Sequence, residues 1–433
     1  MTRFTLSLRD LGRPFWYLWL GESITGLGTQ LMQFALGVWV YQRTGSVLDF
    51  AGIIVAGLVP QLLVLPIAGS LVDRLDRRRV IIVSDLVAAL MSAAVIILLW
   101  RDQLEVIHLY AFTIVAALTN AFKDPAYRAS IGTMLRDDQL TRASGMLGVS
   151  TTALGILAPT LAGGLMVVIG LTGLATLDLL TFVLGTTLIW RAFAHRLAPP
   201  MIVGGIRTVL GESLANFRRS LSFFGQSVSM AGLFFYSLIQ TALLALAATL
   251  ATPLILANHS PRSLGLALSC AAAGALVGSM LMALLDSPGR RAAVILACDA
   301  VLACCIVGLG LADSLLAYCV LEAAGCCAGS VGASCAFALW ISKAPEAQRG
   351  SILVVQGTAA TVCTAVIVLS GAKLVDAWLE AALAPGEILA SLGDLLLNVP
   401  NGRGIAMLFV ISGALGLVTV LGGYAFRPLR QLQ

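Results

Sequence analysis

The chain has 433 residues, of which 59% are hydrophobic and 11% are charged. Soluble domains carry roughly 25% charged residues, so this composition excludes a soluble protein and predicts an integral membrane protein. The net charge of +5 follows from the topology described below, and nothing in the sequence indicates a nucleic-acid partner.

Several apolar runs are long enough to cross a membrane core of roughly 30 Å. They predict an all-α membrane protein with twelve transmembrane helices, at residues 15–41, 49–72, 80–100, 107–127, 143–169, 174–193, 223–256, 264–285, 292–311, 315–341, 351–378 and 404–425. An even number of spans places both termini on one side of the membrane.

Lysine and arginine set the expected orientation, because cytoplasmic loops carry an excess of both. If the N-terminus is cytoplasmic, the inside segments hold all 27 of these residues except Arg43, Arg101, Arg262, Lys373 and Arg403. We therefore expect a multi-pass protein of a bacterial inner membrane with both termini in the cytoplasm.

The loop after the second run carries the most specific motif of the chain, Gly69-Ser-Leu-Val-Asp73-Arg74-Leu-Asp-Arg77-Arg78. It resembles the loop between helices 2 and 3 of the major facilitator superfamily of transporters. The resemblance implies a conformational latch formed by Gly69, Asp73, Arg74, Arg77 and Arg78, in which the Asp73 carboxylate can meet the N-terminus of a neighbouring helix. The positive-inside rule alone would explain the arginines, but not Gly69 and Asp73.

The fifth run contains Ala158-Pro159-Thr-Leu-Ala162-Gly163-Gly164. This resembles a degenerate form of the Gly-Pro-x-x-Gly-Gly motif of the drug:proton antiporters. Proline removes a backbone hydrogen bond and small residues permit close approach of a neighbouring helix, so Pro159, Gly163 and Gly164 are predicted to form a helix hinge and seal. Ordinary packing of small residues remains an alternative.

Shorter stretches are similar to the bacterial macrolide-efflux and siderophore- or peptide-export proteins of the superfamily. They are Thr44-Gly45-Ser46, Asp124-Pro125-Ala126, Leu140-Thr-Arg142-Ala143, Pro345-Glu346-Ala-Gln-Arg349-Gly350 and Gly402-Arg403-Gly404. The fourth run departs from the wider antiporter pattern, because it has no arginine in its middle. A proton-coupling role of such an arginine therefore cannot be carried over.

Two loops repeat one charge spacing: Asp73 to Arg77-Arg78 recurs as Asp286 to Arg290-Arg291. Each loop is followed by an apolar run with one aspartate, Asp85 or Asp299, which we expect to pair with loop arginines. A parallel repeat of this kind predicts two pseudo-symmetric six-helix bundles. The bundles would comprise residues 1–193 and 223–433, joined by a cytoplasmic linker at 194–222.

Proton coupling is expected to depend on acidic residues inside the membrane, where an ionisable group is costly unless it faces a wet cavity or a partner. Glu22 is the first candidate, because it lies roughly 10 Å into its helix and belongs to a polar stripe. Asp178 and Glu322 are the reserve candidates.

Polar stripes at helical spacing occur on the helices that line the central cavity in the superfamily. The resulting candidates for a substrate cavity are Gln30 and Gln33 in the first run, Tyr110, Thr113 and Asn120 in the fourth, and Tyr236 and Gln240 in the seventh. Polar residues of this kind can instead hold helices together, and both interpretations stay open.

The resemblance implies a proton-coupled secondary transporter, sufficient as a monomer, that exports amphiphilic small molecules such as a macrolide, a peptide or a siderophore across the lipid bilayer. The proton gradient would supply the energy. No cofactor or metal is expected, because the cysteines and histidines form no ligand pattern. A facilitator or importer of lipids or metabolites without proton coupling is the alternative, and a membrane enzyme or scaffold is a remote one.

Overall fold

The computed structural model describes residues 11–72, 75–193, 228–284, 290–343, 349–384, 387, 390–397 and 399–426. Every regular element within these residues is a helix. The expected linker at 194–222 and the expected latch residues Asp73 and Arg74 lie outside the described residues.

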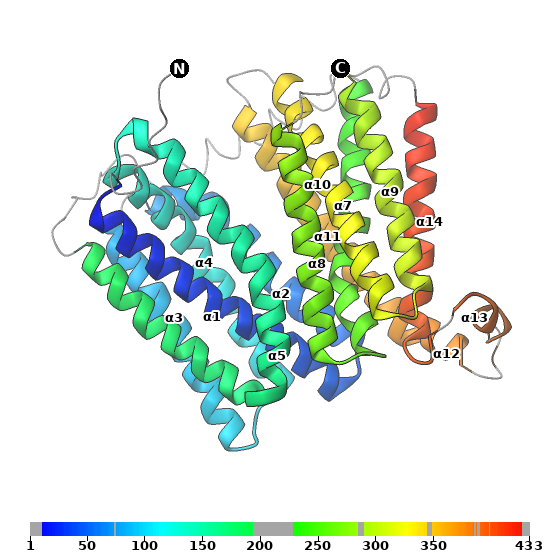
Figure 1. Cartoon of the computed structure of the whole chain (residues 1–433), viewed down its shortest axis with the longest axis horizontal. Coiled ribbons are helices and arrows are strands. Elements are labelled where there is room, and N and C mark those ends of the chain that lie inside the picture. The colour runs from blue at the N-terminus through cyan, green and yellow to red at the C-terminus, as the bar shows by residue number, and fades with distance from the viewer. Residues whose placement is uncertain are drawn as a thin grey trace.

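Long helices in the N-terminal part of the chain make up a first group (Figure 1). Each forms from an apolar run, because a backbone in lipid must satisfy its own hydrogen bonds. These helices are α1 (Gly12–Thr44), α2 (Val47–Val72), α3 (Arg77–Trp100), α4 (Val106–Met134) and α5 (Asp137–Ala192).

A second group of helices lies beside the first (Figure 1). Its long helices are α7 (Val228–Leu256), α8 (Pro261–Leu284), α9 (Arg291–Leu311), α10 (Leu315–Lys343), α11 (Arg349–Leu374) and α14 (Arg403–Ala425). The π-helical turn η3 (Val375–Leu379) continues α11, and the short helices α12 (Glu380–Ala382) and α13 (Ala390–Leu396) follow before α14.

Among the described residues, 10 helices are long and apolar enough to cross a membrane. The prediction of an all-helical membrane protein is confirmed at this level. One of the 10, α5, covers the expected runs 143–169 and 174–193 and is interrupted at Gly170, whose φ of 64° and ψ of −172° suit glycine alone. Helix α1 is 33 residues long but more polar, and it is not one of the 10.

The helices run back and forth between two ends of the molecule (Figure 1). We call the end at which α1 begins and α14 finishes the Gly12 end, and the end at which α1 turns into α2 the Gly45 end. Gly45 adopts a left-handed φ of 64° after the last turn of α1. This glycine lets the chain reverse within two residues.

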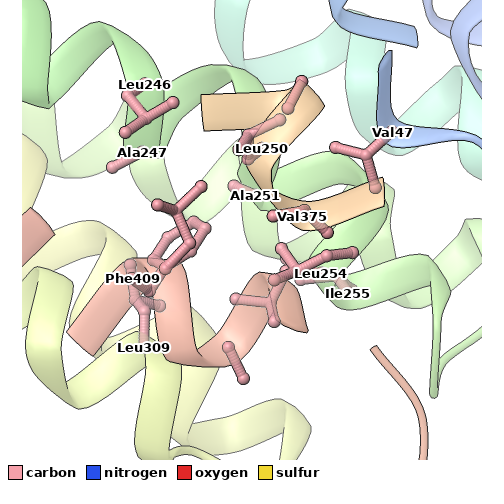
Figure 2. Close-up of a cluster of buried hydrophobic side chains, with 14 of the residues drawn as sticks. Val47, Leu246, Ala247, Leu250, Ala251, Leu254, Ile255, Leu309, Val375 and Phe409 are labelled. Atoms are coloured by element: carbon pink, nitrogen blue, oxygen red, sulfur yellow. The ribbon is translucent and has the colours of Figure 1, made fainter. Parts of the chain in front are cut away.

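The described contacts between the two groups lie in the half of the molecule nearer the Gly45 end. There α5 packs on α8, and α2 packs on α7 and α11. A buried apolar cluster connects Val47 at the start of α2 with Leu250 and Leu254 in α7, Val375 in η3 and Phe409 in α14 (Figure 2). The two groups are therefore held together at the Gly45 end.

Candidate functional site

A buried ion cluster lies inside the first group of helices. The Lys123 ammonium in α4 is 3.0 Å from a carboxylate oxygen of Glu22 in α1 and 2.7 Å from one of Asp85 in α3. Thr186 in α5 donates to the other Asp85 oxygen at 3.5 Å. The side chains of Lys123 and Asp85 are 8% and 1% exposed, while that of Glu22 is 23% exposed. Glu22 is therefore the most accessible member of the cluster.

The length of α4 explains why a lysine lies in this interior position. The helix continues to Met134, so Lys123 lies roughly 16 Å along the axis before its end. The sequence analysis placed Lys123 in a cytoplasmic segment and expected loop arginines to pair with Asp85. That pairing was wrong: Asp85 binds Lys123, and Arg77 instead donates to the Ala129 carbonyl oxygen at 3.1 Å.

The cluster contains two carboxylates and one ammonium. Burying an uncompensated charge costs several kcal/mol, so one added proton would make the group electrically neutral. Lys123 contacts both carboxylates at once. Either carboxylate can therefore take up a proton while the other still neutralises Lys123, and the arrangement can bind and release one proton.

The two reserve candidates for proton coupling lie apart from this cluster. Asp178, in the part of α5 after Gly170, is 3% exposed and accepts a hydrogen bond from Ser92 of α3 at 2.5 Å. Glu322 in α10 is 8% exposed, and no hydrogen bond or ion pair joins it to another described residue. Thus the structure does not bring Glu22, Asp178 and Glu322 together.

The second group of helices contains a different polar site. The Tyr236 hydroxyl in α7 donates to an Asp299 carboxylate oxygen in α9 at 2.6 Å, so the expected pairing of Asp299 with loop arginines was wrong. The Gln240 side chain donates to the Thr419 hydroxyl of α14 at 2.9 Å. Tyr236, Gln240 and Asp299 border a cavity of about 270 Å³ between α7, α9, α10 and α11.

The other expected cavity residues fall into two sets. Gln30 and Gln33 have exposed side chains on α1, and Asn120 is half-buried in α4. Tyr110 and Thr113 lie on the side of α4 that packs against α2: the Tyr110 hydroxyl donates to the Asp49 carbonyl oxygen at 3.3 Å, and both residues closely approach glycines of α2. For Tyr110 and Thr113 the geometry is that of helix packing.

The Pro159 segment forms the close contact between α5 and α8. A Cβ atom at Gly163 would lie 2.5 Å from the Pro261 carbonyl oxygen, and one at Gly265 would lie 2.3 Å from the Pro159 carbonyl oxygen. A Cβ atom at Gly164 would meet nothing within 4 Å. Pro159 and Gly163 therefore belong to a tight backbone contact between the two groups, whereas Gly164 does not.

Part of the expected latch lies at the Gly12 end. Gly69 is in the last turn of α2, and Arg77 and Arg78 begin α3. Asp76 caps α3 by accepting a hydrogen bond from the Arg78 backbone at 3.0 Å. The contacts that Asp73 and Arg74 would add are outside the described part of the chain.

A carboxylate that the sequence analysis did not select joins the two groups at the Gly45 end. Asp376 of η3 accepts hydrogen bonds from the Ser46 hydroxyl at 2.7 Å and from the backbone N–H groups of Val47 and Leu48 at 3.2 and 2.9 Å. It therefore caps the N-terminus of α2 from the other group. Four residues later, Glu380 accepts from the Gly404 backbone at 2.7 Å and caps α14.

The residues that the structure describes contain no set of three or more His, Cys, Asp or Glu side chains that could hold a metal ion. The chemistry of the site is therefore argued from its ion cluster, its cavity and its helix contacts.

The model of a family described as transmembrane secretion effector matches residues 11–339. Macrolide efflux protein A of Streptococcus pyogenes is 25% identical over 172 residues, which are 40% of this chain and 42% of that protein. Multidrug efflux pump Tap of Mycolicibacterium fortuitum is 34% identical over 135 residues, 31% of this chain and 32% of that protein. The chain thus matches less than half the length of these curated relatives.

Solved transporter structures share the fold at low sequence identity. A bacterial homologue of the iron transporter ferroportin, in its inward-facing state, superposes with a TM-score of 0.67 at 15% identity over 95% of this chain and 98% of that chain. The POT family transporter PepTSo gives a TM-score of 0.70 at 11% identity over 97% and 99% of the two chains. At these identities the likeness concerns the fold alone.

Proposed function

Because the chain belongs to the transmembrane secretion effector family of the major facilitator superfamily, we propose that it is a proton-coupled exporter of amphiphilic small molecules. It is a multi-pass transporter, not an enzyme. The named efflux relatives support the direction of transport, and a macrolide, a peptide or a siderophore would be a substrate of the appropriate kind.

In this proposal the membrane domain contains twelve spans in two pseudo-symmetric bundles. The 10 apolar helices become twelve when α1 is added and α5 is counted as two spans divided at Gly170. Residues 1–193 and 223–433 would be the two bundles, with a linker at 194–222. The Gly12 end would face the cytoplasm of a bacterial cell, as the charge distribution indicates.

The ion cluster of Lys123, Glu22 and Asp85 is the observation that carries proton coupling. It has one carboxylate in excess, and Glu22 is its most accessible acid. Protonation of Glu22 would leave Lys123 paired with Asp85 alone, which weakens the link between α1 and α4. A proton could thereby change the packing of the first bundle, so that its release on the cytoplasmic side is linked to substrate export.

Alternating access would open the Gly12 and Gly45 ends in turn. The described contacts between the groups hold the Gly45 end, a state in which substrate could enter from the Gly12 end. Gly69, Asp73, Arg74, Arg77 and Arg78 would form the opposing latch when the Gly12 end closes. The exposed side chains of Gln30 and Gln33, together with Asn120, Tyr236 and Gln240, remain the candidates for substrate contact.

The test is transport by the purified protein in proteoliposomes, with a labelled macrolide and an imposed pH gradient. Glu22→Gln imitates the protonated acid and should abolish gradient-driven export, because the cluster no longer exchanges a proton. Exchange of labelled for unlabelled macrolide without a gradient should persist, since it needs no net proton movement.

Asp178→Asn and Glu322→Gln are the matched neutral substitutions of the other buried acids. If Glu22→Gln keeps full gradient-driven export and one of the others abolishes it, the coupling role belongs to that residue. If all three variants export like the parent, a facilitator without proton coupling replaces the proposal.

A further inference from the structure

We infer that the cavity between α7, α9, α10 and α11 binds organic cations, and that Asp299 supplies the charge that recognises them. This inference rests on the proposed function, because it names the substrate class that the second group of helices would select. The cavity has a volume of about 270 Å³. That is close to the lower limit of ligand pockets, roughly 300 Å³, and suits a compact cation or the charged end of a larger molecule.

Asp299 is the only charged residue among the described residues that line this cavity. Its hydrogen-bond donor is the neutral Tyr236 hydroxyl at 2.6 Å, and no lysine or arginine in the described chain forms an ion pair with it. The corresponding acid of the first group, Asp85, differs in this respect because Lys123 lies 2.7 Å from it. Asp299 therefore keeps a negative charge available to a ligand.

The walls of the cavity suit the rest of such a ligand. Tyr236, Phe337 and Trp340 supply aromatic rings, whose faces attract organic cations. Gln240 and Gln356 supply amide groups. This combination of a single acid with aromatic and amide groups matches an ammonium or phosphonium ion on an apolar body.

Small residues of α10 keep space beside the carboxylate. Gly329, Gly332 and Ala333 line the cavity on that side, and a Cβ atom at Gly332 would lie 3.6 Å from an Asp299 oxygen. A larger residue there would cover the acid. A hard metal ion is a poorer match than an organic cation, because Ca²⁺ or Mg²⁺ requires about six oxygen ligands and no metal-binding group is found in the described residues.

The position of the cavity agrees with loading from the Gly12 end. Its lining residues come from the halves of α7, α9, α10 and α11 that are nearer this end, while the contacts between the groups hold the Gly45 end. The cavity is open on one side. A cation could therefore reach Asp299 in the conformation that the structure shows.

Calorimetric binding to the purified full-length protein tests the inference with two probes of similar shape. Tetraphenylphosphonium carries a positive charge, and triphenylphosphine oxide is neutral. Asp299→Asn keeps the shape of the side chain and removes its charge, so it should weaken tetraphenylphosphonium binding by about tenfold, equivalent to about 1.4 kcal/mol. Triphenylphosphine oxide should bind the parent and the variant alike.

Two further variants separate loss of charge from loss of structure. Asp299→Glu keeps the charge and should restore tetraphenylphosphonium binding, whereas Asp102→Asn makes the same chemical change in an exposed loop at the Gly45 end and should leave it unchanged. The inference is overturned if the parent does not bind tetraphenylphosphonium, or if Asp299→Asn binds it like the parent or weakens both probes equally.

Transport distinguishes this inference from the proposed function. Selective loss of cation binding in Asp299→Asn, together with no gradient-driven export by the parent, would leave the cation site standing and remove the proposed function. Gradient-driven export by the parent, with unchanged cation binding in Asp299→Asn, would remove the cation site alone.

Discussion

Two adjacent glycines of α5 have different surroundings although they share a sequence motif. Gly163 faces the backbone of α8, and Gly164 faces open space. Only the first is therefore placed to control how closely the two groups of helices approach each other.

We expect Gly163→Ala to weaken the closed Gly45 end. The new methyl group would lie 2.5 Å from the Pro261 carbonyl oxygen, and because backbone cannot turn aside, α5 and α8 must separate. Overpacking of this kind costs about 1 to 3 kcal/mol. The temperature of unfolding in detergent should fall, and so should transport in proteoliposomes.

Gly164→Ala is the matched control, since it adds the same methyl group one residue later. Alanine in a helix interior is more stable than glycine by about 0.5 to 1 kcal/mol, so this variant should be unchanged or slightly stabilised. Equal behaviour of the two variants would show that the α5 and α8 contact does not limit stability or transport.

The candidate site shows which residue roles a sequence can reveal. Glu22 was identified from its depth in an apolar run and its polar stripe, and the structure places it in an ion cluster. The partner Lys123 was missed because it lies near the end of the expected run, and charge counting treats such a lysine as part of the loop. Its inward direction depends on the extra helical turns up to Met134, which are too polar to be read as membrane helix.

At the level of elements, η3 and the start of α2 form a closing contact at the Gly45 end. The Asp376 carboxylate meets two free backbone N–H groups and the Ser46 hydroxyl. A helix N-terminus carries a partial positive charge, so the negative charge of Asp376 strengthens the contact between the groups.

We predict that Asp376→Asn opens the Gly45 end more often. Loss of the charge should cost the closed state about 1 kcal/mol, roughly fivefold in the equilibrium between states. Spin labels at positions 43 and 373, in the last turns of α1 and α11, would report this by pulsed electron paramagnetic resonance as a larger population of long distances.

Asp394→Asn provides the comparison for that experiment. Asp394 is an exposed carboxylate that pairs with Arg403 at 2.9 Å within the second group, so its neutralisation should leave the distances between the groups as they are. A distance distribution in Asp376→Asn that matches the parent would show that Asp376 is not part of the closure.

Most helices were predictable from sequence because each needs a long apolar run to span lipid. The structure joins two expected runs into α5, since Gly170 bends the backbone without ending the helical assignment. The Asp376 contact was not predictable, because it joins side chain and backbone groups 328 to 330 residues apart. Helical spacing and charge counts describe only local relations.

For the whole molecule, orientation is the central expectation from sequence that awaits a direct test. A version without the native cysteines, carrying one cysteine at position 79 or 260, should react with a membrane-impermeant maleimide only from the cytoplasm at 79 and only from outside at 260. These positions lie at the Gly12 and Gly45 ends, and Arg79 has an 84% exposed side chain. Labelling of position 79 from outside would reverse the orientation and the direction of transport.

The two groups of helices also share a pattern that the repeated loop motif only partly indicated. In each group an acid on the helix after the repeated loop, Asp85 or Asp299, contacts a polar residue of another helix. Their partners are a lysine in one group and a tyrosine in the other. Equivalent positions can therefore serve different chemistry, and a sequence repeat shows where such acids lie but not what they bind.

The π-helical turn η3 restricts the length of the chain at this point. A π-helix contains one residue more per turn than an α-helix of similar rise, so deletion of a single residue between Val375 and Leu379 would rotate everything after it by about 100°. Asp376 and Glu380 now reach the first turns of two different helices, α2 and α14. After such a deletion one carboxylate could keep its helix while the other pointed away. The segment therefore acts as a spacer of fixed register, in which exchange of residues is tolerated more readily than gain or loss of one.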